Sequence, residues 1–318
     1  MTDVVVTDQT FGGVERERAV AERRGTSFAE YQVRDELATA EVTVGAKVIF
    51  VNFAPITAKV LEGLAPGAVV IRYGIGYDNV DVVAASRLGI RVCNVPDYGA
   101  DTVADHTVAL LLAGLRRVAG YSARIRTEGW VEPASIGRIK GFADTTIGLV
   151  GTGRIGRSVA HRLRPFGFHI LAADPFVKQA ALKGTGIELV TLDELLEHSD
   201  AISLHAPLTE ENHHLLDASA FSRMRLGVVI VNTSRGPLID ESALAAALES
   251  GRVAAAGLDV HEVEPLPARS SLRAIPDVIL TPHAAFYSEA SLASLQRLAA
   301  EEADRALAGE PLRCLVNA

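Results

Sequence analysis

Cysteine, tryptophan and methionine are scarce in this chain. Its 318 residues include 2 cysteines, 2 methionines and 1 tryptophan, and only 5% of them are aromatic. Two cysteines, Cys93 and Cys314, cannot form the disulfide framework of a small secreted scaffold, which excludes that class of protein. This scarcity predicts reduced thiols and, with the N-terminus described next, a cytoplasmic protein.

Long hydrophobic runs and an excess of basic residues are also missing. The apolar runs have strand length or belong to amphipathic helices, so no membrane span is predicted. Residues 1–9 lack the basic start and long apolar stretch of a signal peptide. The formal net charge of −8 gives no indication of nucleic-acid binding, because phosphates require a basic face.

The residues that are present have the composition of a globular protein. Hydrophobic residues make up 48% and charged residues 22%, which excludes disorder, collagen and coiled coil. At roughly 100–200 residues per domain, the length predicts two domains. Apolar runs separated by helical stretches predict parallel sheets that are covered on both faces. The predicted strands are 4–8, 47–51, 68–73, 90–95, 146–150, 169–173, 201–204, 228–232, 254–259 and 278–281.

One strand–turn–helix–strand layout occurs twice. The first copy covers 68–95 and turns at the sequence GIG, residues 74–76. The second covers 146–173 and turns at GTGRIG, residues 151–156. Two copies of this unit predict an α/β fold with two doubly wound parallel-sheet lobes.

The second turn has the spacing of a dinucleotide-binding loop. Gly151 would allow the tight turn, Gly153 would let the backbone approach a pyrophosphate, and Gly156 would let helix and strand pack closely. The N-terminus of the following helix offers N–H groups and partial positive charge to phosphates. Asp174, at the end of the next strand, suits a ribose diol and repels a 2′-phosphate, which favours NAD over NADP. The alternative is a plain tight turn, with Asp174 capping the next helix.

Three later segments place polar residues where strands end. Arg235 follows the strand 228–232, and arginine can clamp a carboxylate with two hydrogen bonds. Glu264 and His283 follow the next two strands, and histidine exchanges protons near neutral pH. A carboxylate anchor, an orienting acid and a proton exchanger are what a hydroxy-acid dehydrogenase needs. Taken singly, each residue also has a structural explanation, such as an ion pair between Arg235 and Asp240.

The chain resembles the D-isomer-specific 2-hydroxyacid dehydrogenases over nearly its full length. The matching blocks are GYDNVD (76–81), VADHT (103–107), GLVGTGRIG (148–156), SLHAPLT (203–209), VNTSRGPLID (231–240), GLDVHEVEP (257–265) and LTPHAA (280–285). Within the family, RYGIGYDNVD (72–81) and TPHAAFYSEAS (281–291) look most like the C-terminal binding protein branch, which includes transcriptional corepressors.

The resemblance implies a flavodoxin-like substrate domain split between 1–99 and 288–318, and a Rossmann NAD-binding domain at 100–287. It implies that Arg235 binds and polarises a 2-oxo acid, that His283 is the general acid/base and that Glu264 supports His283. It implies cofactor contacts from Gly151, Gly153, Arg154, Ile155, Gly156, Asp174, Ala206, Thr233 and Asp259. It implies substrate contacts from Arg72, Ile75, Gly76 and Phe286. The long helical stretch 100–130, beginning near Asp101, would carry a homodimer interface.

Two positions depart from the family. Ile75 stands where members usually have Ser or Thr, so a hydroxyl contact to the cofactor is lost. Phe286 stands where the corepressor branch has tryptophan, which leaves the substrate's identity open. The adjacent His213 and His214 invite a metal interpretation, but consecutive side chains usually diverge and no metal is expected.

Two hypotheses follow from these residues. The first is an NAD-dependent dehydrogenase acting on a small 2-hydroxy or 2-oxo acid. The second is an NAD(H)-sensing dimeric binding protein of the corepressor kind, with vestigial activity. The Arg–Glu–His set is intact, which favours the enzyme.

Overall fold

The computed structural model describes residues 1–317 and divides the chain into two compact units. Unit 1 is formed by Met1–Gly99 together with Tyr287–Ala318, and unit 2 by Ala100–Phe286. The chain therefore leaves unit 1 to build all of unit 2 and then returns. Within residues 1–317, no helix is both long enough and apolar enough to cross a membrane.

Unit 1 is a five-stranded parallel sheet in the order β2-β1-β3-β4-β5, which is the flavodoxin-like order. Its strands are β1 (Val4–Val6), β2 (Phe28–Glu30), β3 (Val48–Val51), β4 (Val69–Arg72) and β5 (Arg91–Cys93). Its helices are α1 (Glu15–Arg23), α2 (Glu36–Val42), α3 (Ala58–Glu62), α4 (Val82–Arg87) and α11 (Glu289–Ala308).

Both faces of this sheet are buried. Successive side chains of a strand point to opposite faces, so Val4 and Val6 join one core and Val5 joins the other. The first core includes residues of α1 and α11, and the second includes residues of α3 and α4. The C-terminal helix α11 is thus part of the core of unit 1.

Unit 2 is a seven-stranded parallel sheet in the order β12-β11-β10-β9-β6-β7-β8. Its strands are β6 (Thr146–Val150), β7 (His169–Ala173), β8 (Ile187–Leu189), β9 (Ala201–Leu204), β10 (Val228–Asn232), β11 (Val253–Leu258) and β12 (Val278–Leu280). Its α-helices are α5 (Ala100–Leu115), α6 (Val118–Glu128), α7 (Arg154–Leu163), α8 (Leu192–His198), α9 (Ala218–Arg223) and α10 (Glu241–Glu249). The strand order reverses between β6 and β9, where open α/β sheets bind ligands at the carboxyl ends of the strands.

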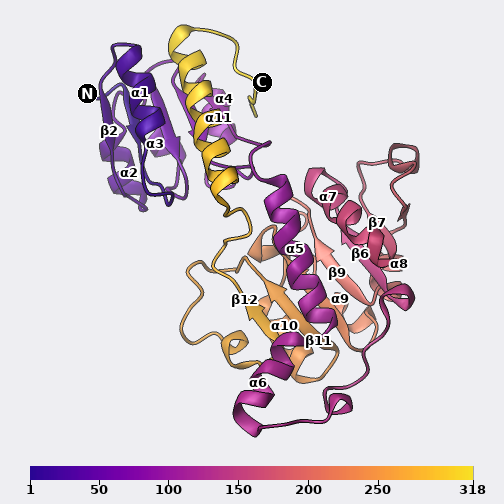
Figure 1. Cartoon of the computed structure of the whole chain (residues 1–318). Coiled ribbons are helices and arrows are strands. Elements are labelled where there is room, and N and C mark those ends of the chain that lie inside the picture. The colour runs from indigo at the N-terminus through magenta and orange to yellow at the C-terminus, as the bar shows by residue number, and fades with distance from the viewer. Residues whose placement is uncertain (318) are drawn as a thin grey trace. The chain divides into compact units, whose positions relative to one another are not determined.

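Two cores cover the two faces of this sheet. One contains residues of α5 and α7, and the other contains residues of α8, α9 and α10. Figure 1 shows α5 crossing in front of the sheet. The prediction of two doubly wound parallel lobes is confirmed.

Three details of the prediction are wrong. The stretch 100–130 is not one helix, because Arg117 adopts a left-handed conformation (φ 53°) and separates α5 from α6. The strands β2 and β8 were not predicted. Each has only three residues and lies at an edge of its sheet, so it needs little apolar sequence.

Candidate active site

The glycine turn after β6 is shaped by close contacts. Gly151 has φ +97°, and a Cβ atom there would lie 2.8 Å from the carbonyl oxygen of His205. A Cβ atom at Gly156 would collide with the carbonyl of Gly151. Among residues 1–317, apart from Gly153 and its two chain neighbours, nothing lies within 4 Å of the position that a Cβ atom would take at Gly153. Packing thus requires glycine at positions 151 and 156, whereas Gly153 leaves room for a ligand. This arrangement suits a dinucleotide pyrophosphate.

Asp174 follows β7 and is hydrogen-bonded to the glycine turn. Its Oδ2 accepts from the backbone N–H and the hydroxyl of Thr152, both at 2.8 Å, and its Oδ1 accepts from Phe176 N–H at 3.0 Å. Partial burial raises the pKa of Asp174, but these hydrogen bonds outweigh it and hold the pKa below its ordinary value. The residue is therefore an ionised carboxylate beside the turn, as a ribose-binding acid must be.

Four further predicted cofactor positions follow the neighbouring strands β6, β9 and β10. Ala206 lies just after β9, and its backbone N would be 3.2 Å from a Cβ atom at Gly151. Thr233 directly follows β10, and its hydroxyl shares a 2.8 Å hydrogen bond with the hydroxyl of Thr107 on α5. Arg154 and Ile155 begin α7. The sheet thus brings these predicted positions to the carboxyl edge beside the switch point.

Glu264 and His283 form a direct pair. Nδ1 of His283 lies 2.8 Å from Oε2 of Glu264, and Oε1 of Glu264 accepts from His261 N–H at 3.0 Å. Partial burial raises the pKa of Glu264, but the hydrogen bond to His283 and the charges of His283 and His261 keep the pKa below its ordinary value. An ionised acid at this distance fixes the imidazole with its proton on Nδ1.

The loop that carries His283 is held by Asp259. His283 has φ +54°, a conformation that is rare for residues other than glycine and is concentrated at functional sites. The carboxylate of Asp259 is fully buried and accepts from Thr281 Oγ1 at 2.5 Å and from the N–H groups of Ala284 and Ala285 at 2.8 Å. The carbonyl of Asp259 also accepts from His283 N–H at 2.7 Å. The sequence does not indicate this anchoring contact, because Asp259 follows β11 and the loop follows β12.

Arg235 lies in a loop that packs on the backbone of His261. Asn232 Nδ2 donates to the carbonyl of Arg235 at 2.8 Å, and the guanidinium donates to the carbonyl of Ser234 at 2.7 Å. A Cβ atom at Gly236 would collide with the backbone of His261, whose N–H donates to Glu264. Arginine, glutamate and histidine therefore follow three neighbouring strands, β10, β11 and β12, at one edge of the sheet.

Three of the predicted substrate contacts lie in unit 1. Arg72 ends β4 and donates to the carbonyl of Tyr73 at 2.7 Å. Gly74 has φ +130°, and a Cβ atom there would collide with the Arg72 guanidinium. The carbonyl of Ile75 accepts from Asn94 Nδ2 at 2.7 Å. Gly76 follows directly, so Asn94 holds the backbone next to it.

Phe286, the fourth predicted substrate contact, lies in unit 2. Its ring centroid is 6.3 Å from that of His283, with the rings at 75°. An aromatic wall thus stands next to the imidazole. Its edge-on geometry is one that aromatic pairs prefer.

The histidine pair does not diverge as expected. The ring centroids of His213 and His214 lie 4.0 Å apart, and His214 Nε2 pairs with Glu262 Oε1 at 2.5 Å. Within residues 1–317, no group of three or more His, Cys, Asp or Glu side chains could hold a metal ion.

A family model described as the NAD-binding domain of D-isomer specific 2-hydroxyacid dehydrogenases matches residues 108–285, more than half of the chain. The chain belongs to this family. It is an NAD-dependent 2-hydroxyacid dehydrogenase, and the matched residues lie within unit 2.

Relatives and solved structures agree with this assignment. The dehydrogenase is 40% identical over 265 residues to the glyoxylate reductase of Korarchaeum cryptofilum, covering 83% of this chain and 80% of the relative. It is 43% identical over 266 residues to the D-3-phosphoglycerate dehydrogenase of Mycobacterium leprae, covering 82% of this chain but only 49% of that longer protein. The crystal structure of D-lactate dehydrogenase from Aquifex aeolicus with NAD and lactic acid has a TM-score of 0.87 and 29% identity, covering 97% of this chain and 96% of that one.

Proposed function

We propose that this dehydrogenase transfers a hydride between NAD(H) and C2 of a small 2-oxo acid or D-2-hydroxy acid, with His283 as the acid/base. The observation that carries the proposal is the 2.8 Å pair of His283 and Glu264, at the same sheet edge as the glycine turn. When bound, NAD(H) supplies or accepts the hydride at its nicotinamide ring.

Glu264 determines which nitrogen of His283 exchanges the proton. Because Nδ1 is hydrogen-bonded to the carboxylate, Nε2 donates a proton to the C2 oxygen in reduction and takes it back in oxidation. The ionised carboxylate also stabilises the imidazolium form that the reductive direction requires. Glu264 thus orients the imidazole of His283 and stabilises its protonated form.

Arg235 binds the substrate carboxylate and polarises the carbonyl at C2. Its planar guanidinium can make two hydrogen bonds to one carboxylate. It also stabilises the negative charge that develops on the oxygen, an effect typically worth about 3–4 kcal/mol. Further substrate contacts are assigned to Arg72, Ile75, Gly76 and Phe286.

The cofactor is assigned to the turn after β6. The pyrophosphate is assigned to Gly151, Gly153 and Gly156 and to the first turn of α7 with Arg154 and Ile155. Asp174 binds the ribose diol and disfavours a 2′-phosphate. Ala206, Thr233 and Asp259 complete the proposed contacts. Because the carboxylate of Asp259 is used by the His283 loop, its part is to hold that loop beside the cofactor.

Small 2-oxo acids are the proposed substrates. Relatives are named for glyoxylate and lactate, which motivates a panel of glyoxylate, pyruvate, hydroxypyruvate and branched 2-oxo acids. Oxidation of NADH with at least one of them is expected. His283→Asn should lower turnover by about 10²- to 10⁴-fold and leave NADH binding, measured by fluorescence titration, unchanged. No turnover with any acid, or full turnover in His283→Asn, would contradict the proposal.

The proposal extends to a homodimer formed through α5, and to a reducing compartment such as the cytoplasm. Asp101 and Asp105 lie on the exposed side of α5, where they pair with Arg162. The two cysteines form no disulfide. The resemblance to the corepressor branch finds no support among the relatives named here, which are enzymes, and no contact within residues 1–317 favours that second hypothesis.

A further inference from the structure

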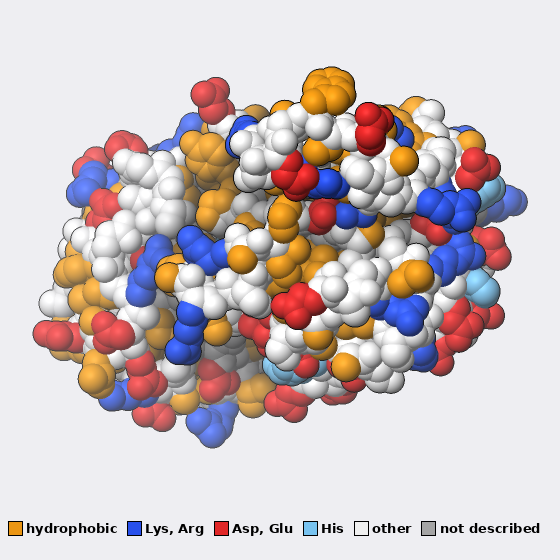
Figure 2. Space-filling model, turned by 90° about the horizontal axis from the view of Figure 1, so that it is seen from below, with side chains coloured by type: hydrophobic (Ala, Val, Ile, Leu, Met, Phe, Trp, Pro, Cys, Tyr) orange, Lys and Arg blue, Asp and Glu red, His pale blue; other side chains and the backbone are white. Residues whose placement is uncertain are grey.

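A group of charged side chains adjoins Glu264 in unit 2. It contains Glu241, the first residue of α10, and His261 and Glu262, which follow β11. Figure 2 shows acidic and basic side chains interspersed over the surface, where water screens their interactions. His261, by contrast, is only 6% exposed, so its contact with an acid is little screened. The predictions from the sequence named none of these three residues.

Glu241 and Glu262 bind each other's backbone. Oε1 of Glu241 accepts from Glu262 N–H at 3.2 Å, and Oε2 of Glu262 accepts from Glu241 N–H at 3.1 Å. Because Glu241 begins α10, its N–H has no partner inside the helix. These reciprocal contacts, the Glu241–Glu262 clamp, join the residues after β11 to the start of α10.

Two imidazoles offset the repulsion between the carboxylates of the clamp. His261 Nδ1 lies 3.2 Å from Glu241 Oε1, and His214 Nε2 lies 2.5 Å from Glu262 Oε1. Like charges at one place repel each other, and an imidazole can supply a hydrogen-bond donor to each acid. The histidines thus let both carboxylates accept backbone N–H groups at one place. This contact also accounts for His214 without a metal ion.

The clamped backbone holds two parts of the proposed active site. His261 N–H donates to Oε1 of Glu264 at 3.0 Å, and Oε2 of the same carboxylate lies 2.8 Å from His283 Nδ1. A Cβ atom at Gly236 would collide with the carbonyl of His261, so the loop that follows Arg235 packs directly on this backbone. A shift of the clamped backbone would therefore move Glu264 and disturb the arginine loop together.

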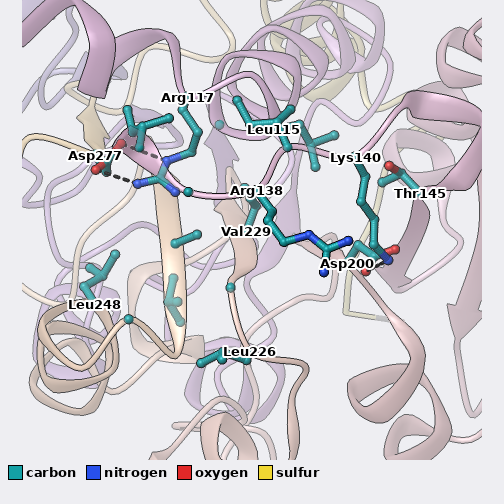
Figure 3. Close-up of a pocket in the computed structure, with 18 of the residues that line it drawn as sticks. Leu115, Arg117, Arg138, Lys140, Thr145, Asp200, Leu226, Val229, Leu248 and Asp277 are labelled. Carbon is teal, nitrogen blue, oxygen red and sulfur yellow. Dashed lines mark hydrogen bonds and ion pairs between the residues drawn. The ribbon is translucent and has the colours of Figure 1, made fainter. Parts of the chain in front are cut away.

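Ion pairs at the other edge of the sheet act on different backbone. Figure 3 shows the pair of Arg117 and Asp277, whose Nη2 and Oδ2 atoms lie 2.7 Å apart. Asp277 immediately precedes β12, whereas His283 follows that strand. The pair in Figure 3 and the cavity that it lines therefore lie at the sheet edge opposite the proposed reaction, while the Glu241–Glu262 clamp lies at the same edge as His283.

We propose that the Glu241–Glu262 clamp holds Glu264 in contact with His283. Glu241, Glu262 and His261 are thus positioning residues, which touch neither substrate nor cofactor. The inference rests on the proposed function, because it assigns further residues to the same acid/base pair. A displacement of about 1 Å in a catalytic group can lower a rate by about 100-fold, so a small movement of this backbone is sufficient to affect turnover.

Amide hydrogen exchange tests the clamp without any reaction. Glu241→Ala removes the acceptor of Glu262 N–H and the partner of the His261 imidazole. Exchange in the segment 260–264, measured by mass spectrometry, should therefore become about 10- to 100-fold faster. Glu241→Gln keeps an acceptor oxygen and should recover part of the protection. Glu249→Ala, at an exposed position of the same helix, is the matched control and should exchange like the unchanged chain.

Turnover tests whether the clamp positions the acid/base pair. Glu241→Ala should lower kcat about 10- to 100-fold and leave the KM for NADH unchanged, since no proposed cofactor contact is altered. Its reductive turnover should also decline at lower pH, because a displaced Glu264 stabilises the imidazolium form of His283 less. Glu241→Gln should recover part of both properties, and Glu249→Ala should match the unchanged enzyme.

Two results would overturn the inference. Exchange in the segment 260–264 that is no faster in Glu241→Ala would show that the clamp does not hold this backbone. Full kcat with an unchanged pH profile, in a variant whose exchange is faster, would show that the backbone does not position Glu264. An unchanged chain that turns over no 2-oxo acid would instead contradict the proposed function, and hydrogen exchange would still decide whether the clamp holds the segment.

Discussion

In the proposed mechanism, the charge of Glu264 decides which nitrogen of His283 carries the proton. Glu264→Gln is expected to lower turnover by about 10²- to 10⁴-fold, because an amide can donate to Nδ1 and stabilise the wrong tautomer. The Glu264 pKa lies below its ordinary value, so the acid stays ionised throughout the neutral range. Without the carboxylate, the imidazolium form that reduction requires is less stabilised. Reductive turnover of the variant should therefore begin to decline at lower pH than that of the unchanged enzyme. Steady-state rates from pH 5 to pH 9 measure both effects.

The matched variant is Glu264→Asp, which keeps the charge and should lose less activity than the amide. NADH titration should give the same affinity for all three proteins, since Glu264 is not among the proposed cofactor contacts. Equal pH profiles for the amide variant and the unchanged enzyme would show that the carboxylate does not act through His283.

At this scale the sequence predicts residue types better than their partners. The order of strands and polar residues indicated that Arg235, Glu264 and His283 would meet at one edge. It did not show that the carboxylate of Asp259 is used by the His283 loop. That contact joins residues that follow two neighbouring strands and lie more than 20 positions apart in the sequence, and its geometry depends on the packing of both strands.

At the scale of elements, a buried acid joins α1 to the residue that follows β4. Glu17 is fully buried, Tyr73 donates to its Oε1 at 3.0 Å, and its Oε2 has no hydrogen-bond partner within residues 1–317. Burial raises the pKa of Glu17 to about 7, although the Tyr73 hydroxyl and the backbone favour the ionised form. Tyr73 directly precedes the Gly74–Gly76 loop, so this pair supports a proposed substrate contact.

This raised pKa makes the stability of the fold depend on pH. Stabilisation by neutral Glu17 is fully present below the ordinary pKa of 4.5 and is lost as pH rises through about 7. Glu17→Gln should match the unchanged protein near pH 4 and exceed it above pH 8. The expected gain is about 3 kcal/mol in the free energy of unfolding, measured by urea denaturation. Glu22→Gln, on the exposed side of α1, should show no such trend.

If Glu17→Gln and Glu22→Gln changed stability alike at every pH, the buried acid would not be the cause. The sequence could not predict this pair, because a glutamate on a short helix normally faces solvent. Its burial results from the packing of α1 on the sheet beside Phe11, Phe50 and Tyr73. Elements with a clear apolar pattern were predictable, whereas the break at Arg117 depends on one backbone conformation.

At the scale of the whole molecule, each unit has its own two cores. The cores of unit 2 contain only residues between 104 and 280, so none of their members comes from unit 1. One core of unit 1 contains Leu295, Ala299 and Ala303 of α11 and therefore needs both ends of the chain. The two units should consequently differ in whether they fold when the chain is divided into fragments.

A fragment of residues 100–286 is expected to fold, to melt cooperatively and to bind NADH. At about 100 times the dissociation constant, NADH adds about 2.7 kcal/mol and should raise the melting temperature by about 5–10 °C. The fragment should show no turnover of 2-oxo acids, because Arg72 and the Gly74–Gly76 loop are absent. Residues 1–99 alone should remain unfolded, because α11 is missing from their core. If the fragment failed to bind NADH, or turned over substrate at the rate of the full chain, the division of cofactor and substrate between the two units would be wrong.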